Sequence, residues 1–240
     1  MSYNLDKFKA GLKELNIVLD QNQTEQFLNY YEMLIQWNKV MNLTGITEFD
    51  QVVEKHFLDS LCLVKSVDLT KKYRILDLGT GAGFPGIPLK IAFPDMEIVL
   101  MDSLNKRIRF LNEVIQTLGL KEISAVHGRA EEMAKKAEYR ENFDICVSRA
   151  VANLSSLAEY CIPFVKKDGM FLSYKSGEAD SEIIQAKHAV FLLGGKIGDI
   201  IKYQIPGTDM NRSLVKICKV KNTPKAYPRK AGTPSKNPLK

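Results

Sequence analysis

The sequence lacks any hydrophobic stretch long enough to cross a membrane. Its longest unbroken apolar run, Ala189 to Leu193, has five residues, whereas a membrane-spanning helix needs about 20. The N-terminus, Met1–Asp6, also lacks the basic and then apolar pattern of a secretory signal. We therefore expect a cytoplasmic protein that has no membrane partner.

Cysteine and histidine are scarce and scattered. The chain contains only Cys62, Cys146, Cys161, Cys218, His56, His127 and His188. The cysteines form no CxxC pair, and the histidines are not spaced as metal ligands are. We predict that the cysteines are reduced packing residues and that the protein holds no metal.

Acidic residues are absent from the last 22 positions, 219–240, which carry a charge of +7. The cations there are Lys219, Lys221, Lys225, Arg229, Lys230, Lys236 and Lys240. The whole chain has a net charge of +6, so the preceding residues carry −1. Four of the nine prolines also lie there, which opposes helix formation. The tail is predicted to be an extended cationic arm, which either binds a polyanion or is a disordered solubilising end.

The rest of the chain has an ordinary globular composition, with 45% hydrophobic and 26% charged residues. Apolar residues at helical spacing run through residues 1–65, and Asn22 and Glu25 are placed as a capping box for the second helix. We predict three regions: a helical extension (1–65), a core (66–220) and a basic, proline-rich tail (221–240).

From residue 73 the pattern changes to short β-rich runs that alternate with helical stripes. The expected strands are 73–78, 97–102, 123–126, 143–148, 169–174, 197–205 and 214–220. Such alternation predicts right-handed βαβ units and a mostly parallel sheet. The last two runs are joined by Pro206–Asp209, which leaves no room for a helix, so they should form an antiparallel hairpin. The fold class is therefore α/β, with seven strands in a Rossmann-like sheet.

A glycine-rich loop follows the first expected strand, in the sequence Asp77-Leu-Gly79-Thr-Gly81-Ala-Gly83-Phe84-Pro-Gly86. Glycines at alternate positions let the backbone turn tightly and approach a ligand. The segment Gly81-x-Gly83-x-x-Gly86 fits a dinucleotide fingerprint, whereas Asp77-x-Gly79-x-Gly81-x-Gly83 is the pattern of S-adenosylmethionine sites.

The position of the strand end favours S-adenosylmethionine. If the turn begins at Gly79, the dinucleotide spacing puts Phe84 where a third glycine is needed. Asp77 is suited to the amino group of a methionine moiety. Asp102, at the end of the second strand, can accept hydrogen bonds from ribose hydroxyls in either case.

Several motifs resemble those of the ribosomal RNA small subunit methyltransferase G family, also called glucose-inhibited division protein B. They are Asp77–Ile91, the run Asp102-Ser103-x-x-Lys106-Arg107-x-x-Phe110-Leu111, Asn42-Leu43-Thr44, His56-x-x-Asp59-Ser60-Leu61, Ser148-Arg149-Ala150 and Tyr227–Pro234. The resemblance extends from about residue 30 to the end of the chain. At Tyr227–Lys230 it implies that the tail docks on the body, with Tyr227 packed and the cations facing RNA.

The resemblance implies a class I S-adenosylmethionine-dependent methyltransferase. It also implies methylation of guanine N7 in a decoding-region loop (helix 18) of 16S rRNA, in the bacterial cytoplasm. The substrate would be 16S rRNA, an assembly intermediate or the small ribosomal subunit. By position, the family's cofactor contacts fall on Gly79, Phe84, Ala130, Glu131 and Arg149. Because Arg129 replaces the aspartate that many methyltransferases have there, we expect backbone groups of Ala130 and Glu131 to bind the base.

Guanine N7 carries a lone pair and no proton, so its methylation needs no general base and depends on positioning. Arg149 is the expected positioning residue; otherwise it forms an ion pair with Glu131 or Asp102. Lys175 either holds a phosphate or guanine O6 or is solvent-exposed. His56 either binds substrate or makes helix-packing contacts together with Asp59. The remaining RNA-binding candidates are Arg212, Lys225, Arg229, Lys230 and Lys236.

Two other functions stay open from the sequence. A methyltransferase for a small molecule or another RNA would share the glycine loop, although seven cations in the tail bring a metabolite little benefit. A nicotinamide-dependent oxidoreductase would use Gly81, Gly83 and Gly86 instead.

Overall fold

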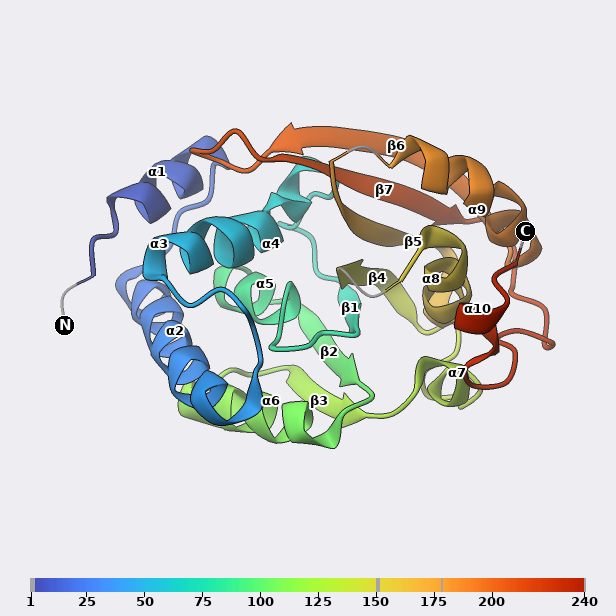
Figure 1. Ribbon diagram of the computed structural model, residues 1–240, viewed down its shortest axis with the longest axis horizontal. Coiled ribbons are helices and arrows are strands. Elements are labelled where there is room, and N and C mark those ends of the chain that lie inside the picture. Colours follow the sequence, from blue (N-terminus) through green and yellow to red (C-terminus); the bar gives the residue numbers. More distant parts are fainter. Residues whose placement is uncertain (1–2, 150–151, 178, 240) are drawn as a thin grey trace.

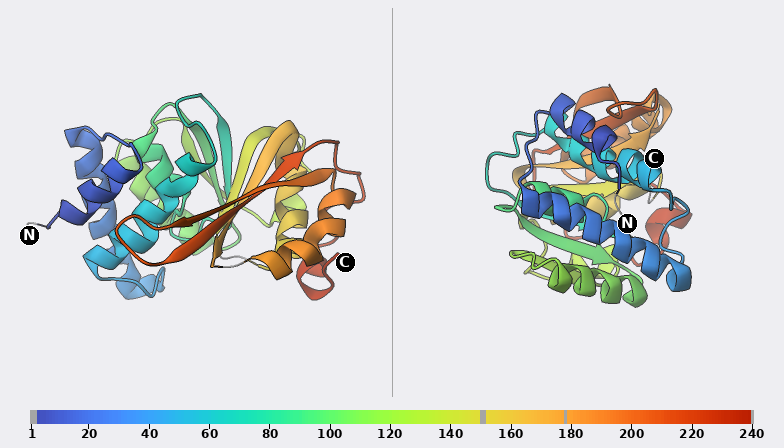
Figure 2. Two further views of the ribbon diagram at one scale, coloured as in Figure 1. Left: turned by 90° about the horizontal axis from the view of Figure 1, so that it is seen from above. Right: turned by 90° about the vertical axis from the view of Figure 1, so that its left-hand side faces the viewer.

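The computed structural model describes residues 3–149, 152–177 and 179–239. Helices cover both sides of one sheet, as Figures 1 and 2 show. The strands are β1 (Arg74–Leu78), β2 (Glu97–Asp102), β3 (Ile123–His127), β4 (Phe143–Arg149), β5 (Val165–Ser176), β6 (Gly195–Gln204) and β7 (Asn211–Lys219). The helices of the core are α5 (Gly86–Ala92), α6 (Asn105–Thr117), α7 (Ala130–Met133), α8 (Leu154–Cys161), the 3₁₀ turn η3 (Ile162–Phe164) and α9 (Asp180–Leu192).

The sheet has the strand order β3-β2-β1-β4-β5-β7-β6. Strands β1 to β5 pair with one another in parallel, and β7 lies antiparallel between β5 and β6. All seven expected strands and the C-terminal hairpin are confirmed. The strand order reverses beside β1, so the carboxyl ends of β1 and β4 flank the place where such sheets bind ligands.

Side chains of each central strand alternate between two hydrophobic clusters, because successive strand residues point to opposite faces. Ile75 of β1 belongs to the cluster under α2, α5 and α6, whereas Leu76 belongs to the cluster under α8 and α9. The first cluster also takes in Phe8, Phe27 and Phe57 from the N-terminal helices. The extension therefore shares one core with the sheet, and its separation at residue 65 stays a prediction.

The N-terminal helices are α1 (Asp6–Glu14), α2 (Gln21–Met41), α3 (Phe49–Val52), a π-helix η1 (Val53–Leu58), α4 (Asp59–Leu61) and the 3₁₀ turn η2 (Cys62–Lys65). The capping box of α2 is formed by Asp20 and Gln23, so the expectation of Asn22 and Glu25 was wrong. Asp20 accepts from the Gln23 amide, and the Gln23 side chain accepts from the Asp20 amide. The helix thus begins two residues earlier than the apolar stripe indicated.

The C-terminal segment is not a free arm, because it packs on the body of the protein. It contains a short helix, α10 (Thr233–Lys236), with Pro234 in its first turn, where a missing N–H costs nothing. Arg140 donates to the carbonyls of Thr223 (2.8 Å) and Tyr227 (2.9 Å). The expectation of an extended arm was therefore wrong, because polar anchors fold the segment back, and the docking on the body that the family resemblance implied is what the structure has. Among the described residues, no helix combines the length and apolarity needed to cross a bilayer.

Candidate active site

Two cavities open at the carboxyl ends of the parallel strands and share Gly79 in their walls. The larger, of about 510 Å³, is lined from the glycine loop, the η1 region, β4, β5 and β7. The smaller, of about 280 Å³, is lined from the ends of β1 and β2, the turn after β3 and the C-terminal segment. The two cavities therefore adjoin at Gly79, and their walls differ in composition.

The glycine loop is shaped by close contacts on one side and open space on the other. Gly83 has φ +100°, and a Cβ there would lie 2.4 Å from Ile87 Cδ1. The hydroxyl of Tyr30, from α2, donates to the carbonyl of Ala82 at 2.5 Å. A Cβ on Gly81, by contrast, would meet nothing within 4 Å, although its φ of +62° favours glycine. The loop is thus held from below by the N-terminal extension and left open towards the larger cavity.

Asp77 does not reach either cavity. Its side chain is fully buried under the loop, where Oδ2 accepts from the Thr80 hydroxyl (2.6 Å) and the Gly86 amide (2.8 Å). Burial raises the pKa of Asp77 to about 6. The strand alternation turns this side chain to the α5 face, where Oδ2 fixes the loop and the buried Oδ1 has no hydrogen-bond partner. The contact of Asp77 with a methionine amino group stays a prediction.

Asp102 lies at the mouth of the smaller cavity, as a ribose-binding acid should. It accepts hydrogen bonds from the amides of Gly81 (3.0 Å) and Leu104 (2.9 Å) and from Arg107 (3.0 Å). These donors orient the carboxylate and tie the second strand to the glycine loop. Its assignment to the ribose hydroxyls stays a prediction.

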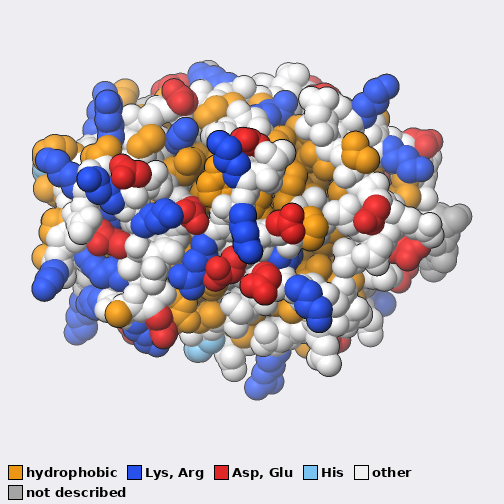
Figure 3. All heavy atoms as spheres, turned by 180° about the vertical axis from the view of Figure 1, so that it is seen from behind, with side chains coloured by type: hydrophobic (Ala, Val, Ile, Leu, Met, Phe, Trp, Pro, Cys, Tyr) orange, Lys and Arg blue, Asp and Glu red, His pale blue; other side chains and the backbone are white. Residues whose placement is uncertain are grey.

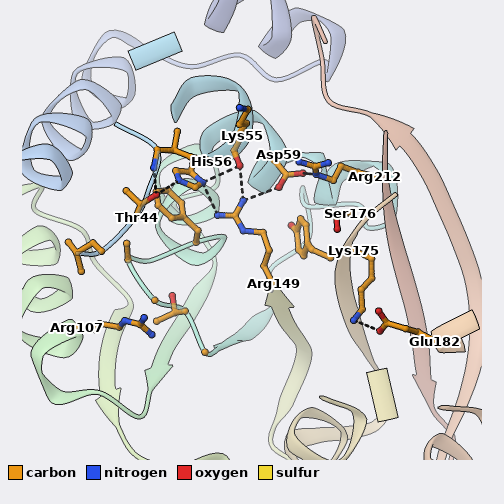
Figure 4. A pocket seen from close by; sticks show the side chains of 18 residues that line it. Thr44, Lys55, His56, Asp59, Arg107, Arg149, Lys175, Ser176, Glu182 and Arg212 are labelled. Carbon is orange, nitrogen blue, oxygen red and sulfur yellow. Dashed lines mark hydrogen bonds and ion pairs between the residues drawn. The ribbon is translucent and has the colours of Figure 1, made fainter. Parts of the chain in front are cut away.

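Arg149 projects from the end of β4 into the larger cavity, where it is paired with Asp59 (Figure 4). Its guanidinium donates to Asp59 Oδ2 at 2.9 Å and to the carbonyl of Lys55 at 3.1 Å. Tyr203 also donates to Asp59, at 3.2 Å. The alternative ion pairs of Arg149 with Glu131 or Asp102 are not formed. Ala150, the next residue of this motif, lies outside the described residues.

His56 is a neutral, oriented member of the same group. His56 Nδ1 lies 3.1 Å from the carbonyl oxygen of Lys55 and 3.3 Å from Arg149 Nη2, and Nε2 lies 2.9 Å from the Thr44 hydroxyl oxygen, so both ring nitrogens have polar partners. Burial and then the charge of Arg149 lower the pKa of His56 to about 3. Its ring stacks on Phe84 at 4.5 Å between centroids, and the Arg149 guanidinium lies 5.2 Å from the Phe84 centroid.

Two further predicted cations line the same cavity. Lys175, at the end of β5, donates to Glu182 at 2.6 Å and to the carbonyl of Ala152 at 3.2 Å, so it is not simply solvent-exposed. Arg212 is at the start of β7, and its Nε lies 3.6 Å from Oδ1 of Asp59. The structure therefore brings His56, Arg149, Lys175 and Arg212 together in one cavity.

Ala130 and Glu131 line the smaller cavity, as expected of an adenine site. The Glu131 side chain is buried, and its Oε1 accepts from the amide of Gly232 at 2.8 Å. Gly232 and Ser235 of the C-terminal segment line this cavity as well. Residues of the tail and of the glycine loop therefore line the same cavity, although they lie far apart in the sequence.

The tail cations have different surroundings. Arg229 forms three bonds to the carboxylate of Glu159, which is 0% exposed, and Lys219 is buried against Glu141 at 3.0 Å. Arg229 is therefore corrected from a phosphate contact to an anchor of the tail. Lys225, Lys230 and Lys236 are exposed and stay RNA-binding predictions.

No site role was predicted for Glu182, Arg107 or Thr44, although all three line the larger cavity. Arg107 and Thr44 stand in motifs of the family resemblance, whereas no sequence motif singled out Glu182. The spacing of His56 and Asp59 on one helical face was a usable signal, but their partner Arg149 is 90 positions away from Asp59. Within the described ranges, no group of three or more His, Cys, Asp or Glu side chains could hold a metal ion.

Solved structures with the same architecture define the class of protein. An S-adenosylmethionine-dependent methyltransferase from Aquifex aeolicus matches 73% of this chain and 96% of its own, with a TM-score of 0.54 and 14% identity. Fibrillarin from Aeropyrum pernix, solved with S-adenosylmethionine, matches 67% of this chain and 72% of its own, with a TM-score of 0.51 and 16% identity. At these identities the likeness establishes the fold, which is that of class I methyltransferases.

The sequence comparisons identify the family. The model of the family described as rRNA small subunit methyltransferase G matches residues 23–211. The protein named ribosomal RNA small subunit methyltransferase G of Lachnoclostridium phytofermentans is 58% identical over 97% of this chain and 96% of its own. Its namesake in Desulforamulus reducens is 52% identical over 96% of both chains. This chain therefore belongs to the rRNA small subunit methyltransferase G family, and its cofactor is S-adenosylmethionine.

Proposed function

We propose that this protein transfers the methyl group of S-adenosylmethionine to N7 of a guanine in 16S rRNA, in the decoding-region loop of helix 18. Family membership supports the reaction. The observation that carries the residue roles is the cavity around Arg149, in which His56 is neutral and the carboxylates of Asp59 and Glu182 are both paired with cations. The substrate would be 16S rRNA within the small subunit or an assembly intermediate.

The two cavities that meet at Gly79 fit the two ends of the cofactor. Asp102 and the backbone of Ala130 and Glu131 would hold the adenosyl end in the smaller cavity. The loop from Gly79 to Phe84 would hold the methionine end beside the larger one, where Gly81 leaves open space. When bound, S-adenosylmethionine supplies an electrophilic methyl group on a positively charged sulfur.

The charges around Arg149 suit this chemistry. An arginine alone would repel a sulfonium, but the carboxylate of Asp59 at 2.9 Å offsets its charge. The faces of Phe84 and its neighbours tolerate a cation at short range. Asp59 thereby lets a cationic cofactor and a cationic side chain occupy one cavity.

Arg149 would orient the guanine without taking a proton from it. A guanidinium has five N–H donors, more than the three bonds to Lys55, His56 and Asp59, so it can also donate to guanine O6. O6 and N7 lie on the same edge of the base, and a donor at O6 leaves the lone pair of N7 free to attack in line. Burial lowers the pKa of His56, and both of its ring nitrogens have polar partners, so this side chain would stay neutral beside the guanine.

The RNA backbone would approach over the cationic rim of the larger cavity. Lys175 and Arg212 lie in its wall, and we propose Lys225, Lys230 and Lys236 as outer phosphate contacts. On the face seen in Figure 3, Lys and Arg lie among Asp and Glu side chains, with apolar side chains between them. That mixed face would attract an RNA backbone less strongly than the cations at the cavity rim do.

A labelling experiment tests the proposal. Small subunits from cells that lack this protein are incubated with it and with S-adenosylmethionine that carries a deuterated methyl group. Mass spectrometry should find one deuterated 7-methylguanosine, which oligonucleotide mapping should place in helix 18. Arg149→Lys keeps the charge but loses the planar fork, and it should slow transfer at least tenfold. Lys196→Ala, an exposed change on β6, serves as the control. Label on another atom of guanine, or none on RNA, would refute the proposal.

A further inference from the structure

The smaller cavity is completed by a segment that lies about 100 positions after its other walls. Leu78, Met101, Asp102 and Ala130 come from the parallel strands and the turn after β3. Gly232 and Ser235 come from the C-terminal segment, and Tyr160 comes from α8. Without residues 232–235 this cavity would lose one wall.

Polar contacts to buried side chains hold that wall in place. The amide of Gly232 donates to Glu131 at 2.8 Å, and the carbonyl of Pro234 accepts from the Ser156 hydroxyl at 2.7 Å. Before Gly232 in the sequence, the backbone amide and the guanidinium of Arg229 both donate hydrogen bonds to the carboxylate of Glu159. Glu131, Ser156 and Glu159 are all buried, so these bonds are shielded from water. These buried hydrogen bonds therefore fix the position of the wall relative to the sheet.

The composition of the cavity fits a nucleoside. Leu78 and Ala130 offer apolar surface to the faces of a base, and Asp102 offers acceptors at the end that joins the glycine loop. Ser235 brings a hydroxyl to the opposite side and donates to the carbonyl of Gly232 at 3.1 Å. A purine held between the strand ends and the tail would have polar groups along its edge and apolar groups on its faces.

We propose that residues 232–235 form one wall of the subsite for the adenosyl group of the cofactor, and that Glu131 is the positioning residue that holds this wall. The inference rests on the proposed function, because it names a part of the same cofactor site. The tail would then contact the cofactor through residues 232–235 and would also present its exposed lysines to RNA.

Two substitutions near the C-terminus compare a residue that lines the cavity with one that does not. Ser235→Leu places a larger side chain at the cavity wall, whereas Asn237→Leu places the same side chain at an exposed residue outside the lining. Calorimetry with S-adenosylhomocysteine and with 5′-methylthioadenosine should show at least a tenfold weakening for Ser235→Leu, by a similar factor for both ligands. Asn237→Leu should bind both within twofold of the parent, and both variants should keep the parent's melting temperature.

Glu131 is tested by a graded pair of variants. Glu131→Gln keeps an oxygen acceptor for the Gly232 amide and should bind S-adenosylhomocysteine within about threefold of the parent. Glu131→Ala removes the acceptor and should weaken binding at least tenfold, as should a chain that ends at Ala231. A chain that ends at Asn237 keeps the wall and should bind like the parent.

The outcomes separate this inference from the proposed function. If the parent binds S-adenosylhomocysteine and methylates guanine, but Ser235→Leu and the chain ending at Ala231 bind it with parental affinity, the wall assignment is wrong and the function stands. If the folded parent binds neither ligand, both are wrong.

Discussion

The two ends of the chain reach the cofactor-binding edge from opposite faces of the sheet, and different forces hold them there (Figure 1). The N-terminal helices pack through an aromatic cluster: Phe57 lies within 6.1 Å, between ring centroids, of Phe8, Phe27 and Tyr30. The C-terminal segment is held by Arg140, Glu131 and the pair of Arg229 with Glu159. One end is secured by burial of apolar area, and the other by polar bonds to buried groups.

This difference explains why the structure of the N-terminal end could be predicted from residue patterns and that of the C-terminal end could not. Apolar burial produces a helical periodicity, and the stripe through Phe27, Tyr30 and Leu34 indicated α2. Buried polar anchors produce no periodicity, because Glu159 and Glu131 look like surface residues in a sequence. A cationic tail with four prolines therefore resembled a disordered arm.

The largest effect should follow from removing the centre of the aromatic cluster. Phe57→Ala deletes a ring that is 1% exposed, which should lower the free energy of unfolding by about 4 kcal/mol. Urea denaturation measures this. Val18→Ala is the control, because Val18 is 92% exposed and should change stability little. A loss below about 1 kcal/mol for Phe57→Ala would mean that the extension adds little to the core.

Breaking the ion pair of Arg229 with Glu159 should lower the free energy of unfolding somewhat less. Arg229→Ala leaves the carboxylate of Glu159 buried without its charged partner, and we expect a loss of about 3 kcal/mol. Replacing both, as Arg229→Met with Glu159→Leu, removes the stranded charge and should recover most of the loss. If the single and double variants unfold at the same urea concentration, the pair is not what anchors the tail.

The cofactor site itself was only partly predictable. The glycine loop and Asp102 follow directly from local sequence, because both lie at strand ends whose geometry the fold class determines. Asp77 was placed correctly along the chain, but its role depended on which face of β1 it points to. Asp59 and Ser235 reach the cavities through packing between distant segments, which single-sequence patterns do not encode.

A smaller effect should come from the hydrogen bond that joins α2 to the glycine loop. Tyr30→Phe leaves the Ala82 carbonyl without its buried donor, which should cost about 1–2 kcal/mol of stability. It should also weaken binding of S-adenosylhomocysteine severalfold, because the loop loses its support. Tyr31→Phe removes a comparable bond, to the Thr47 carbonyl, but does not touch the loop. We therefore expect Tyr31→Phe to lower stability alone; equal ligand affinity in the two variants would contradict a role of α2 in shaping the loop.

The smallest effect concerns pH. The pKa of His56 falls from 6.5 to about 3 on folding, so between these values the unfolded chain binds more protons and stability decreases as pH falls. Asp77 acts in the opposite direction between 3.8 and about 6, because its pKa is raised in the folded protein. His56→Gln removes only the first contribution. Between pH 6.5 and 5 the parent should therefore lose about 1 kcal/mol per pH unit relative to this variant, by urea denaturation at each pH. Parallel stability curves for the two proteins would show that His56 is solvated and not held neutral between Arg149 and Thr44.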